Sequence, residues 1–231
     1  MIYTFLSDIR KMKDLVKGGV ENIDGLLSNR APESVKKYVA ETNNISVKIE
    51  KIGAYNTLIS ALGLFFGSAN FEIERTEYGK PKLLNPDGSF SGIYMNISHC
   101  KNLCAVTLSD ESEVGVDVQD TVNKDRAQRL EKRFFDGIKL PRKYPEIEYM
   151  MYFSDKNGVM HYADLPELLC VTDKYFIGDF SAKWVLGEAA LKCDGRGFSA
   201  VADIEKMLAE RKAEIIKIKI GNDIYRVATV I

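Results

Sequence analysis

The chain has 231 residues, 45% of them hydrophobic and 28% charged, a balance that is ordinary for a globular protein with a sizeable core. The formal net charge of -1 gives no overall field that would attract nucleic acid or a membrane, so any anion-binding site must be local. The polar N-terminus argues against a signal peptide, and no run of about 18 apolar residues occurs, so we expect an intracellular, cytoplasmic protein.

The cysteines indicate neither a zinc site nor a disulfide framework. No Cys-x-x-Cys pair occurs among the four cysteines, and the only histidines are His99 and His161. Reduced thiols fit the intracellular location expected above.

The first half of the chain mixes strand and helix patterns. Residues 2–7 predict an edge strand, and residues 33–42 and 50–66 carry apolar positions at helical spacing. Residues 71–76 and 81–84 predict a short hairpin. Further strands are expected at residues 93–97, 103–109 and 113–119.

The second half begins with a predicted helix at residues 124–135 and continues with an irregular stretch at 138–178, which contains a hairpin turn at 155–158. A helix at 180–192 follows and is closed by glycines. The chain finishes with a helix at 203–211 and a hairpin whose tip is at 221–223.

This order predicts an α+β protein. Two runs of similar content meet near residues 111–113, which indicates two pseudo-symmetric α+β halves, each a small mostly antiparallel sheet packed on a long helix. We expect an N-terminal half over residues 1–112 and a C-terminal half over residues 113–231. Periodicity alone does not show that the halves are related.

Two segments carry polar side chains at spacings that suit chemistry. Valines alternate with other residues from 114 to 120, so Asp117 and Gln119 project from one face of a strand and can converge on a cation. Later, Trp184, Glu188 and Lys192 fall within an arc of ~80° on a helix. Taken alone, each pattern favours a simpler structure: a strand with a solvated face, and a helix with a buried tryptophan and an exposed ion pair.

Two further segments are polar. Ser98 and His99 end an apolar strand, where a histidine can bind phosphate but is more often a structural hydrogen-bonding group. Gly79, Lys80 and Pro81 lie in a segment whose composition by itself indicates a surface turn.

The order of these motifs is more specific than any one of them. A Gly-Lys-Pro turn, an Asn-Ile-Ser-His strand, a Gly-Val-Asp-Val strand, a helix with Trp-x-x-x-Glu-Ala-x-x-Lys and a Gly-x-Gly exit follow one another within residues 78–199, about half of the chain. This series resembles the signature of the 4′-phosphopantetheinyl transferases of the larger, surfactin-synthetase-activating type. The phenylalanine pair after Arg133 resembles the same family.

The resemblance implies an enzyme that transfers 4′-phosphopantetheine from coenzyme A to a serine of an acyl or peptidyl carrier protein and releases 3′,5′-ADP. It implies a monomer that resembles a fused dimer, with coenzyme A in the cleft between its halves. Asp117 and Glu188 match the family's ligands for Mg²⁺, with Mn²⁺ as a second possible metal, and both ions prefer such oxygen ligands. Gln119 stands where many relatives carry a further acid.

The resemblance also assigns roles to the other residues. Glu188, or a water that it orients, is the implied general base, and Lys192 would neutralise or protonate the leaving phosphate. Ser98 and His99 match the phosphate-binding step. The adenine and ribose end of coenzyme A is expected to pack on Gly79, Lys80 and Pro81.

The chain departs from the family pattern at three positions. Gln119 is a weaker magnesium ligand than a carboxylate, Gly187 replaces a common lysine, and Asn56 replaces a basic residue that usually binds the 3′-phosphate. A catalytically weak or inactive homologue that binds coenzyme A or a carrier therefore stays open as an alternative.

A third hypothesis is an unrelated α+β protein with chance motifs. It predicts more than about 8–10 Å between the carboxylates of Asp117 and Glu188, too far for one cation with bonds of ~2 Å. Residues 138–178 are either a plain surface insertion or part of a carrier-docking surface. The candidates for docking contacts are Arg142, Lys143, Tyr144, Met150 and Met151.

Overall fold

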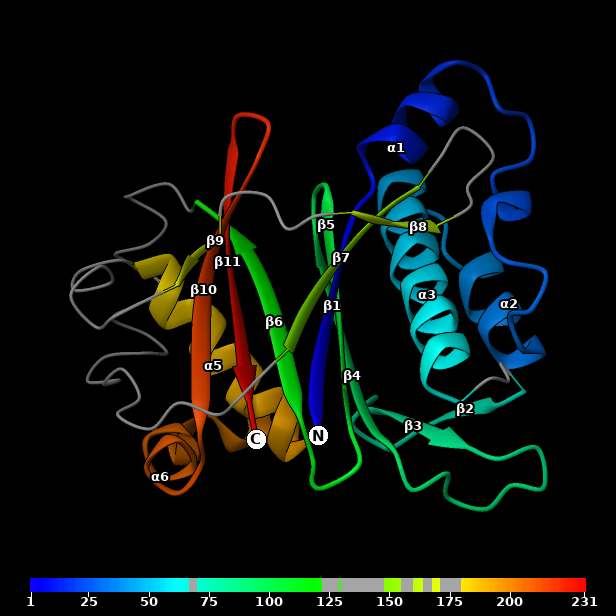
Figure 1. Ribbon diagram of the computed structural model, residues 1–231. Helices are drawn as coiled ribbons and strands as arrows, with labels where there is room; N and C mark the ends of the chain where they lie inside the picture. Colours follow the sequence, from blue (N-terminus) through cyan, green and yellow to red (C-terminus); the bar gives the residue numbers. More distant parts are fainter. Residues whose placement is uncertain (67–69, 122–128, 130–147, 155–159, 164–167, 171–179) are drawn as a thin grey trace.

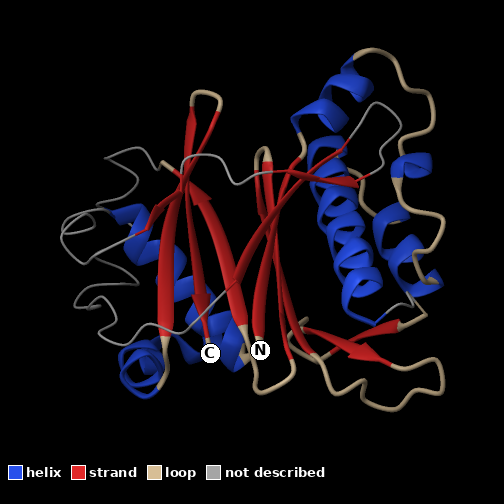
Figure 2. Cartoon of the chain, in the orientation of Figure 1, coloured by secondary structure: helices blue, strands red, loops and turns tan. Residues whose placement is uncertain are grey.

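Two β-sheets lie face to face, and each carries helices on its outer face (Figures 1 and 2). The computed structural model describes residues 1–66, 70–121, 129, 148–154, 160–163, 168–170 and 180–231. Within these residues, no helix is long and apolar enough to cross a membrane. The mixture of helices and mostly antiparallel sheets confirms the predicted α+β class.

The first sheet has five strands in the order β4-β5-β1-β7-β8. All its pairings are antiparallel except that between β1 and β7. Helices α1 (Arg10–Lys17), α2 (Glu33–Ala40) and α3 (Ile45–Phe66) cover its outer face. Its strands are β1 (Ile2–Asp8), β4 (Tyr94–Cys100), β5 (Leu103–Ser109), β7 (Glu148–Ser154) and β8 (Met160–Ala163).

The second sheet has four antiparallel strands in the order β6-β11-β10-β9. Helix α5 (Phe180–Asp194), the 3-10 segment Gly197–Asp203 and helix α6 (Ile204–Glu210) cover its outer face. Its strands are β6 (Gly115–Asp120), β9 (Leu168–Cys170), β10 (Ala213–Ile220) and β11 (Asp223–Val230). A separate hairpin of β2 (Glu72–Arg75) and β3 (Pro81–Leu84) completes the described strands.

Apolar side chains fill the space between the two sheets. Leu6, Leu103 and Ala105 of the first sheet meet Val116, Val118 and Tyr225 among others of the second. A second core lies under α1, α2 and α3, and a third lies under α5 and α6. Burial of both faces of each sheet is the main force that holds the layers together.

The prediction that residues 2–7 form an edge strand is wrong. Strand β1 lies between β5 and β7 in the middle of the first sheet. Its side chains are buried on both faces, with Phe5 against the helices and Leu6 against the second sheet. A strand with two covered faces has a nearly continuous apolar sequence, and a short run of this kind does not reveal its place in the sheet.

Most of the other predicted elements are confirmed, and their ends agree with the predicted ends to within five residues. Helix α1 and strand β9, which lies inside the stretch taken as irregular, residues 138–178, were not predicted. The hairpin expected around residues 155–158 is confirmed by the antiparallel pairing of β7 with β8, although the turn itself lies outside the described residues. The helix expected at residues 124–135 also lies outside them, apart from Arg129.

The division of the chain at residues 112 and 113 stays a prediction, as does the pseudo-symmetry of the halves. Strands β7 and β8 come from the second half of the chain but join the first sheet, β7 beside β1. A segment of the predicted C-terminal half therefore belongs to the first sheet.

Candidate functional site

A glycine lets helix α5 lie directly on strand β6. A Cβ atom at Gly115 would be only 2.0 Å from the carbonyl oxygen of Ala189 and 2.4 Å from the backbone nitrogen of Cys193. Only a residue without a side chain allows this approach. Because side chains alternate along a strand, Asp117 shares the face of Gly115 and lies under the same helix, which carries Glu188 and Lys192.

Asp117, Ser98 and Lys192 form a closed triangle of polar contacts. The ammonium of Lys192 lies 2.6 Å from Oδ1 of Asp117 and 2.9 Å from Oγ of Ser98, and the Ser98 hydroxyl donates to the same Oδ1 at 2.8 Å. Ser98 Oγ also accepts the backbone N–H of Val118 at 3.2 Å. The hydroxyl thus makes all three of its bonds, and it ties strand β4 to strand β6.

The carboxyl group of Glu188 lies beside this triangle without a bond of its own. It is half-buried, and within the described part of the chain no hydrogen bond or ion pair reaches it. Burial, together with the charge of Asp117, raises the pKa of Glu188 to about 7, against the opposing charge of Lys192. The effect of Asp117 places the two predicted metal ligands in one electrostatic environment.

This pKa predicts how stability depends on pH. The ordinary pKa of Glu188 is 4.5 and that of the folded protein is about 7, so the folded state favours the protonated form. Stability from this group is complete below pH 4.5 and is lost as pH rises through about 7. In metal-free buffer, Glu188→Gln should therefore raise the melting temperature at pH 8 but not at pH 4. Calorimetry at both values tests this, and an equal change at both would contradict it.

Asp117 and Glu188 fit a divalent cation, whereas Gln119 fits one less well. A half-buried carboxylate without a partner beside a second carboxylate is costly to keep charged, and a cation between them would remove that cost. Gln119 is less well placed: its amide donates to Oδ1 of Asp120 at 2.6 Å, and among the described residues no hydrogen bond joins it to Asp117 or Glu188. Three acidic, histidine or cysteine side chains do not gather anywhere in the described chain.

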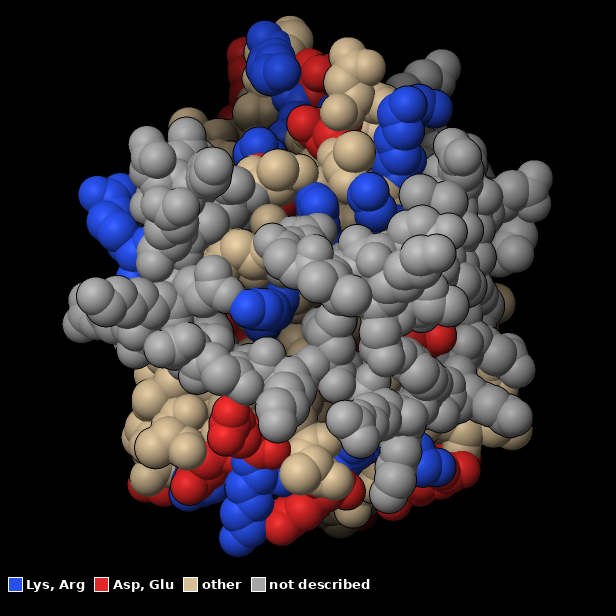
Figure 3. Space-filling view, turned by 90° about the vertical axis from the view of Figure 1, so that its left-hand side faces the viewer, with Lys and Arg blue, Asp and Glu red and all other residues tan. Residues whose placement is uncertain are grey.

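A basic cleft of about 210 Å³ opens next to Lys192. No acidic side chain occurs among the described residues that line it, whereas basic and acidic side chains are interspersed along the lower edge of the face in Figure 3. The charge of the cleft is thus a local feature, as the net charge of the chain requires. The charged or titratable side chains in its wall are Lys51, Arg75, Lys80, Lys192, His99, Tyr38, Tyr55 and Tyr78.

One wall of the cleft combines cations with aromatic rings. The ammonium of Lys51 lies 3.9 Å from the centroid of the Tyr38 ring, and the guanidinium carbon of Arg75 lies 4.0 Å from it. Arg75 also donates to the hydroxyl of Tyr55 at 2.5 Å and to the carbonyl of Gly79 at 2.8 Å. These contacts place two positive charges at one aromatic ring, and a phosphate monoester would be attracted to them.

The predicted turn residues Gly79, Lys80 and Pro81 all line the cleft. The turn needs glycine because Gly79 has a φ of 82°. Lys80 is not a free surface lysine: its ammonium is paired with Glu113 and donates to the carbonyl of Cys193 at 2.7 Å. It therefore fixes the C-terminal end of helix α5 beside the cleft, a structural contact that the sequence did not indicate.

The structure separates two residues that the motif placed together. Ser98 and His99 are neighbours on β4, so their side chains point to opposite faces: Ser98 toward Asp117, and His99 toward helix α3 and the cleft. Ser98 is buried and is not part of the cleft wall. Its place is beside the acidic pair, whereas His99 is available to a ligand in the cleft.

Lys51 lies near position 56 in the sequence, where a basic group was expected, but sequence reasoning missed Arg75. Asn56 is buried and holds a loop, with its side chain bonded to the backbone of Ser28 at 2.8 Å and of Leu26 at 2.9 Å. Arg75 and Lys51 supply the positive charge in the cleft instead. For Lys51, the only local signal was its spacing from Tyr55 on one helical face, which many ordinary helices share.

Most of the predicted docking residues lie outside the described part of the chain. Arg142, Lys143, Tyr144 and the phenylalanine pair after Arg133 lie outside the described residues. Met150 and Met151 belong to β7, an inner strand of the first sheet.

Comparison with known proteins adds no family. A scan against protein-family models finds no match, and a search of curated proteins finds no matching relative.

Proposed function

We propose that this chain is a 4′-phosphopantetheinyl transferase that moves the phosphopantetheine arm of coenzyme A onto a serine of an acyl or peptidyl carrier protein. One observation carries the proposal: Lys192 lines a cleft that also contains other cations and tyrosines, and it contacts the acidic residue expected to bind the metal. The ordered motifs described above bring these groups together from β4, β6 and α5. A cytoplasmic monomer is part of the same proposal.

The residues that line the cleft support coenzyme A as the ligand. Lys51 and Arg75, held at the Tyr38 ring, suit the adenosine 3′-phosphate end, because ammonium and guanidinium groups both bind phosphate. The pyrophosphate would then lie toward Lys192. Glu188 and Asp117 would face the phosphorus atoms from the floor of the site.

A divalent cation is part of the proposal. Asp117 and Glu188 would hold Mg²⁺ or Mn²⁺, with water or Gln119 completing the ligands, and the ion would neutralise charge on the pyrophosphate. The protein's own groups supply the rest of the chemistry.

Glu188 is the proposed general base. The serine oxygen of the carrier bonds to the β-phosphorus of coenzyme A while the phosphoanhydride bond to 3′,5′-ADP breaks, and the hydroxyl proton passes to the Glu188 carboxylate. In the metal-free protein, burial and the charge of Asp117 raise the pKa of Glu188 to about 7, so this carboxylate is more basic than an exposed glutamate. Lys192 would donate a hydrogen bond to the leaving phosphate oxygens.

Mass spectrometry of carrier proteins tests the proposal. The protein is incubated with Mg²⁺, coenzyme A and several apo carriers, and each modified carrier should gain the mass of one phosphopantetheine. Asp117→Asn should abolish the gain, whereas Asp120→Asn, on the opposite face of the same strand, is the matched control. Absence of transfer to every carrier by folded protein that binds coenzyme A would refute catalysis.

A non-catalytic binder of coenzyme A or a carrier is the second candidate. The position of Gln119 favours it, since its amide is directed to Asp120 and the site has only two acids. Calorimetry with coenzyme A separates the two functions, because such a binder shows affinity without turnover in the presence of metal.

The ion pair of Lys192 with Asp117 leads to a prediction on metal affinity. A cation at Asp117 must displace an ammonium that lies 2.6 Å from Oδ1. Without coenzyme A, Lys192→Met should therefore bind Mg²⁺ roughly tenfold more tightly, which corresponds to about 1.4 kcal/mol for one charge-assisted contact. Lys51→Met removes a charge from the same cleft without touching Asp117, and an equal gain in that variant in titration calorimetry would contradict displacement.

A further inference from the structure

A carboxylate lies directly behind the wall of the basic cleft. Glu50 of helix α3 is mostly buried, with 13% of its side chain exposed, and precedes the cleft residue Lys51. A negative charge at this place would by itself weaken the binding of an anion. We therefore expect Glu50 to have a role whose benefit is larger than this loss of anion affinity.

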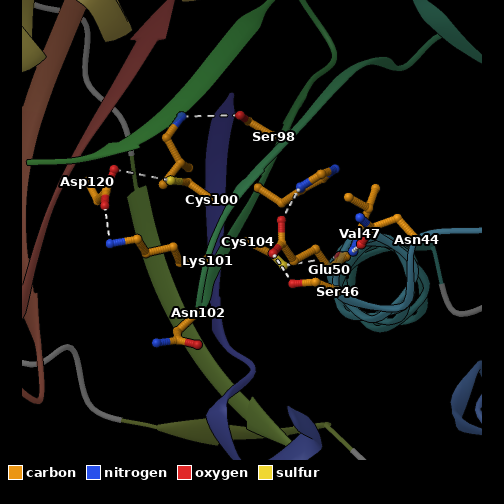
Figure 4. A network of polar contacts seen from close by, with 12 residues as sticks. Asn44, Ser46, Val47, Glu50, Ser98, Cys100, Lys101, Asn102, Cys104 and Asp120 are labelled. Atoms are coloured by element: carbon orange, nitrogen blue, oxygen red, sulfur yellow. Dashed lines mark hydrogen bonds and ion pairs between the residues drawn. The ribbon is translucent and has the colours of Figure 1, made fainter. Parts of the chain in front are cut away.

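Both oxygens of Glu50 are engaged. Oε2 lies 3.0 Å from Nδ1 of His99, and Oε1 lies 3.2 Å from the ammonium of Lys13 and accepts the Ser46 hydroxyl at 3.3 Å. Figure 4 shows Glu50 and Ser46 on helix α3 beside the strands of the first sheet. Burial alone raises the pKa of Glu50, but its contacts with His99 and Lys13 outweigh burial and lower it, so the group is a carboxylate at neutral pH.

The contact with Glu50 determines how the histidine faces the cleft. His99 lines the cleft, and its Nδ1 is taken by Glu50, so the opposite edge of the ring, with Nε2, is left for a ligand. A carboxylate at Nδ1 fixes the orientation of an imidazole ring. For Nδ1–H to bond to Glu50 while Nε2–H donates to a phosphate, the ring must carry a proton on each nitrogen. The ammonium of Lys13, 3.2 Å from Oε1, balances the charge of Glu50.

We propose that Glu50 is a positioning residue, which holds the His99 ring so that its Nε2–H donates to a phosphate group in the cleft. The identity of the ligand, coenzyme A, rests on the proposed function. The contact between Glu50 of α3 and His99 of β4 does not depend on the proposed function.

A double-mutant cycle on coenzyme A binding tests the role of Glu50. Dissociation constants are measured by calorimetry in metal-free buffer for the wild type, Glu50→Ala, His99→Ala and the double variant. Each single change should weaken binding roughly 5- to 20-fold, as expected for a charged hydrogen bond. The double variant should bind no more weakly than His99→Ala within about twofold, because Glu50 acts only through that ring.

A merely structural role gives a different pattern. If Glu50 only supports helix α3 through Lys13 and Ser46, Glu50→Ala weakens binding by the same factor with or without His99, and the proposal is overturned. An unchanged dissociation constant in Glu50→Ala overturns it as well. Glu50→Gln guards against misfolding: it keeps an oxygen for the Nδ1 proton, and we expect its affinity to lie between those of the wild type and Glu50→Ala.

Spectroscopy of the ring gives a second, independent readout. The chain has only two histidines, so ¹⁵N spectra contain few imidazole signals, and His99→Ala identifies those of residue 99. The Nδ1–H signal should be visible in the wild type and in Glu50→Gln and lost in Glu50→Ala. Transfer that fails although coenzyme A binds and the cycle behaves as expected refutes catalysis alone. A wild type that binds no coenzyme A refutes both proposals.

Discussion

A methyl group at position 115 should separate helix α5 from strand β6 and remove activity. The Cβ atom of Gly115→Ala would meet backbone atoms at 2.0 and 2.4 Å, which cannot rotate away as a side chain can. We expect a loss of stability of about 1–3 kcal/mol from overpacking. We also expect a fall in transfer of at least roughly 100-fold, because a shift of about 1 Å moves Glu188 and Lys192 away from Asp117.

Gly63→Ala is the matched control for this experiment. Gly63 also lies in a packed element, helix α3, but beyond its own turn of helix no heavy atom of the described residues lies within 4 Å of where its Cβ would be. Alanine there should stabilise the protein by about 0.5–1 kcal/mol and leave transfer unchanged. Thermal unfolding and the carrier assay measure both effects. Normal activity and stability in Gly115→Ala would show that the helix does not need this close approach.

Glu188→Gln should abolish transfer while the fold becomes more stable at pH 8. Loss of a general base lowers rates by about 10²- to 10⁴-fold, and removal of the proposed metal-binding charge adds to that loss. The pKa of about 7 means that the native carboxylate is ionised at a cost above that pH, a cost that the amide does not have. Opposite changes in activity and stability are typical of a functional group rather than a structural one.

The carrier assay and calorimetry on the same sample measure the two effects of Glu188→Gln. Asp120→Asn controls for the loss of a carboxylate near the strand end, since Asp120 is paired with Lys101 (Figure 4). Near-normal transfer by Glu188→Gln would remove Glu188 from the mechanism. Loss of both activity and stability would make its role structural.

Local sequence patterns were sufficient for most helices and hairpins. Helical spacing identified α2, α3 and α5, and glycines at 195 and 221 marked ends and turns that the structure confirms with φ values of 91° and 61°. These features depend on residues near one another in the chain. The order of strands does not, and for that reason β1 was placed wrongly at an edge and β7 was not predicted beside it.

The candidate site, too, has features that local sequence patterns predicted and features that they did not. The sequence alone determined the types of groups at Asp117, Glu188 and Lys192 and their faces on a strand and a helix, because side-chain direction follows from the repeat of each element. Only the tertiary structure decided that Lys192 lies on Asp117, that Glu188 has no partner within the described chain, and that His99 faces Glu50. It also brought Arg75 and Tyr38 to the cleft. Contacts between elements far apart in the chain depend on how layers pack, and packing is set by the whole core at once.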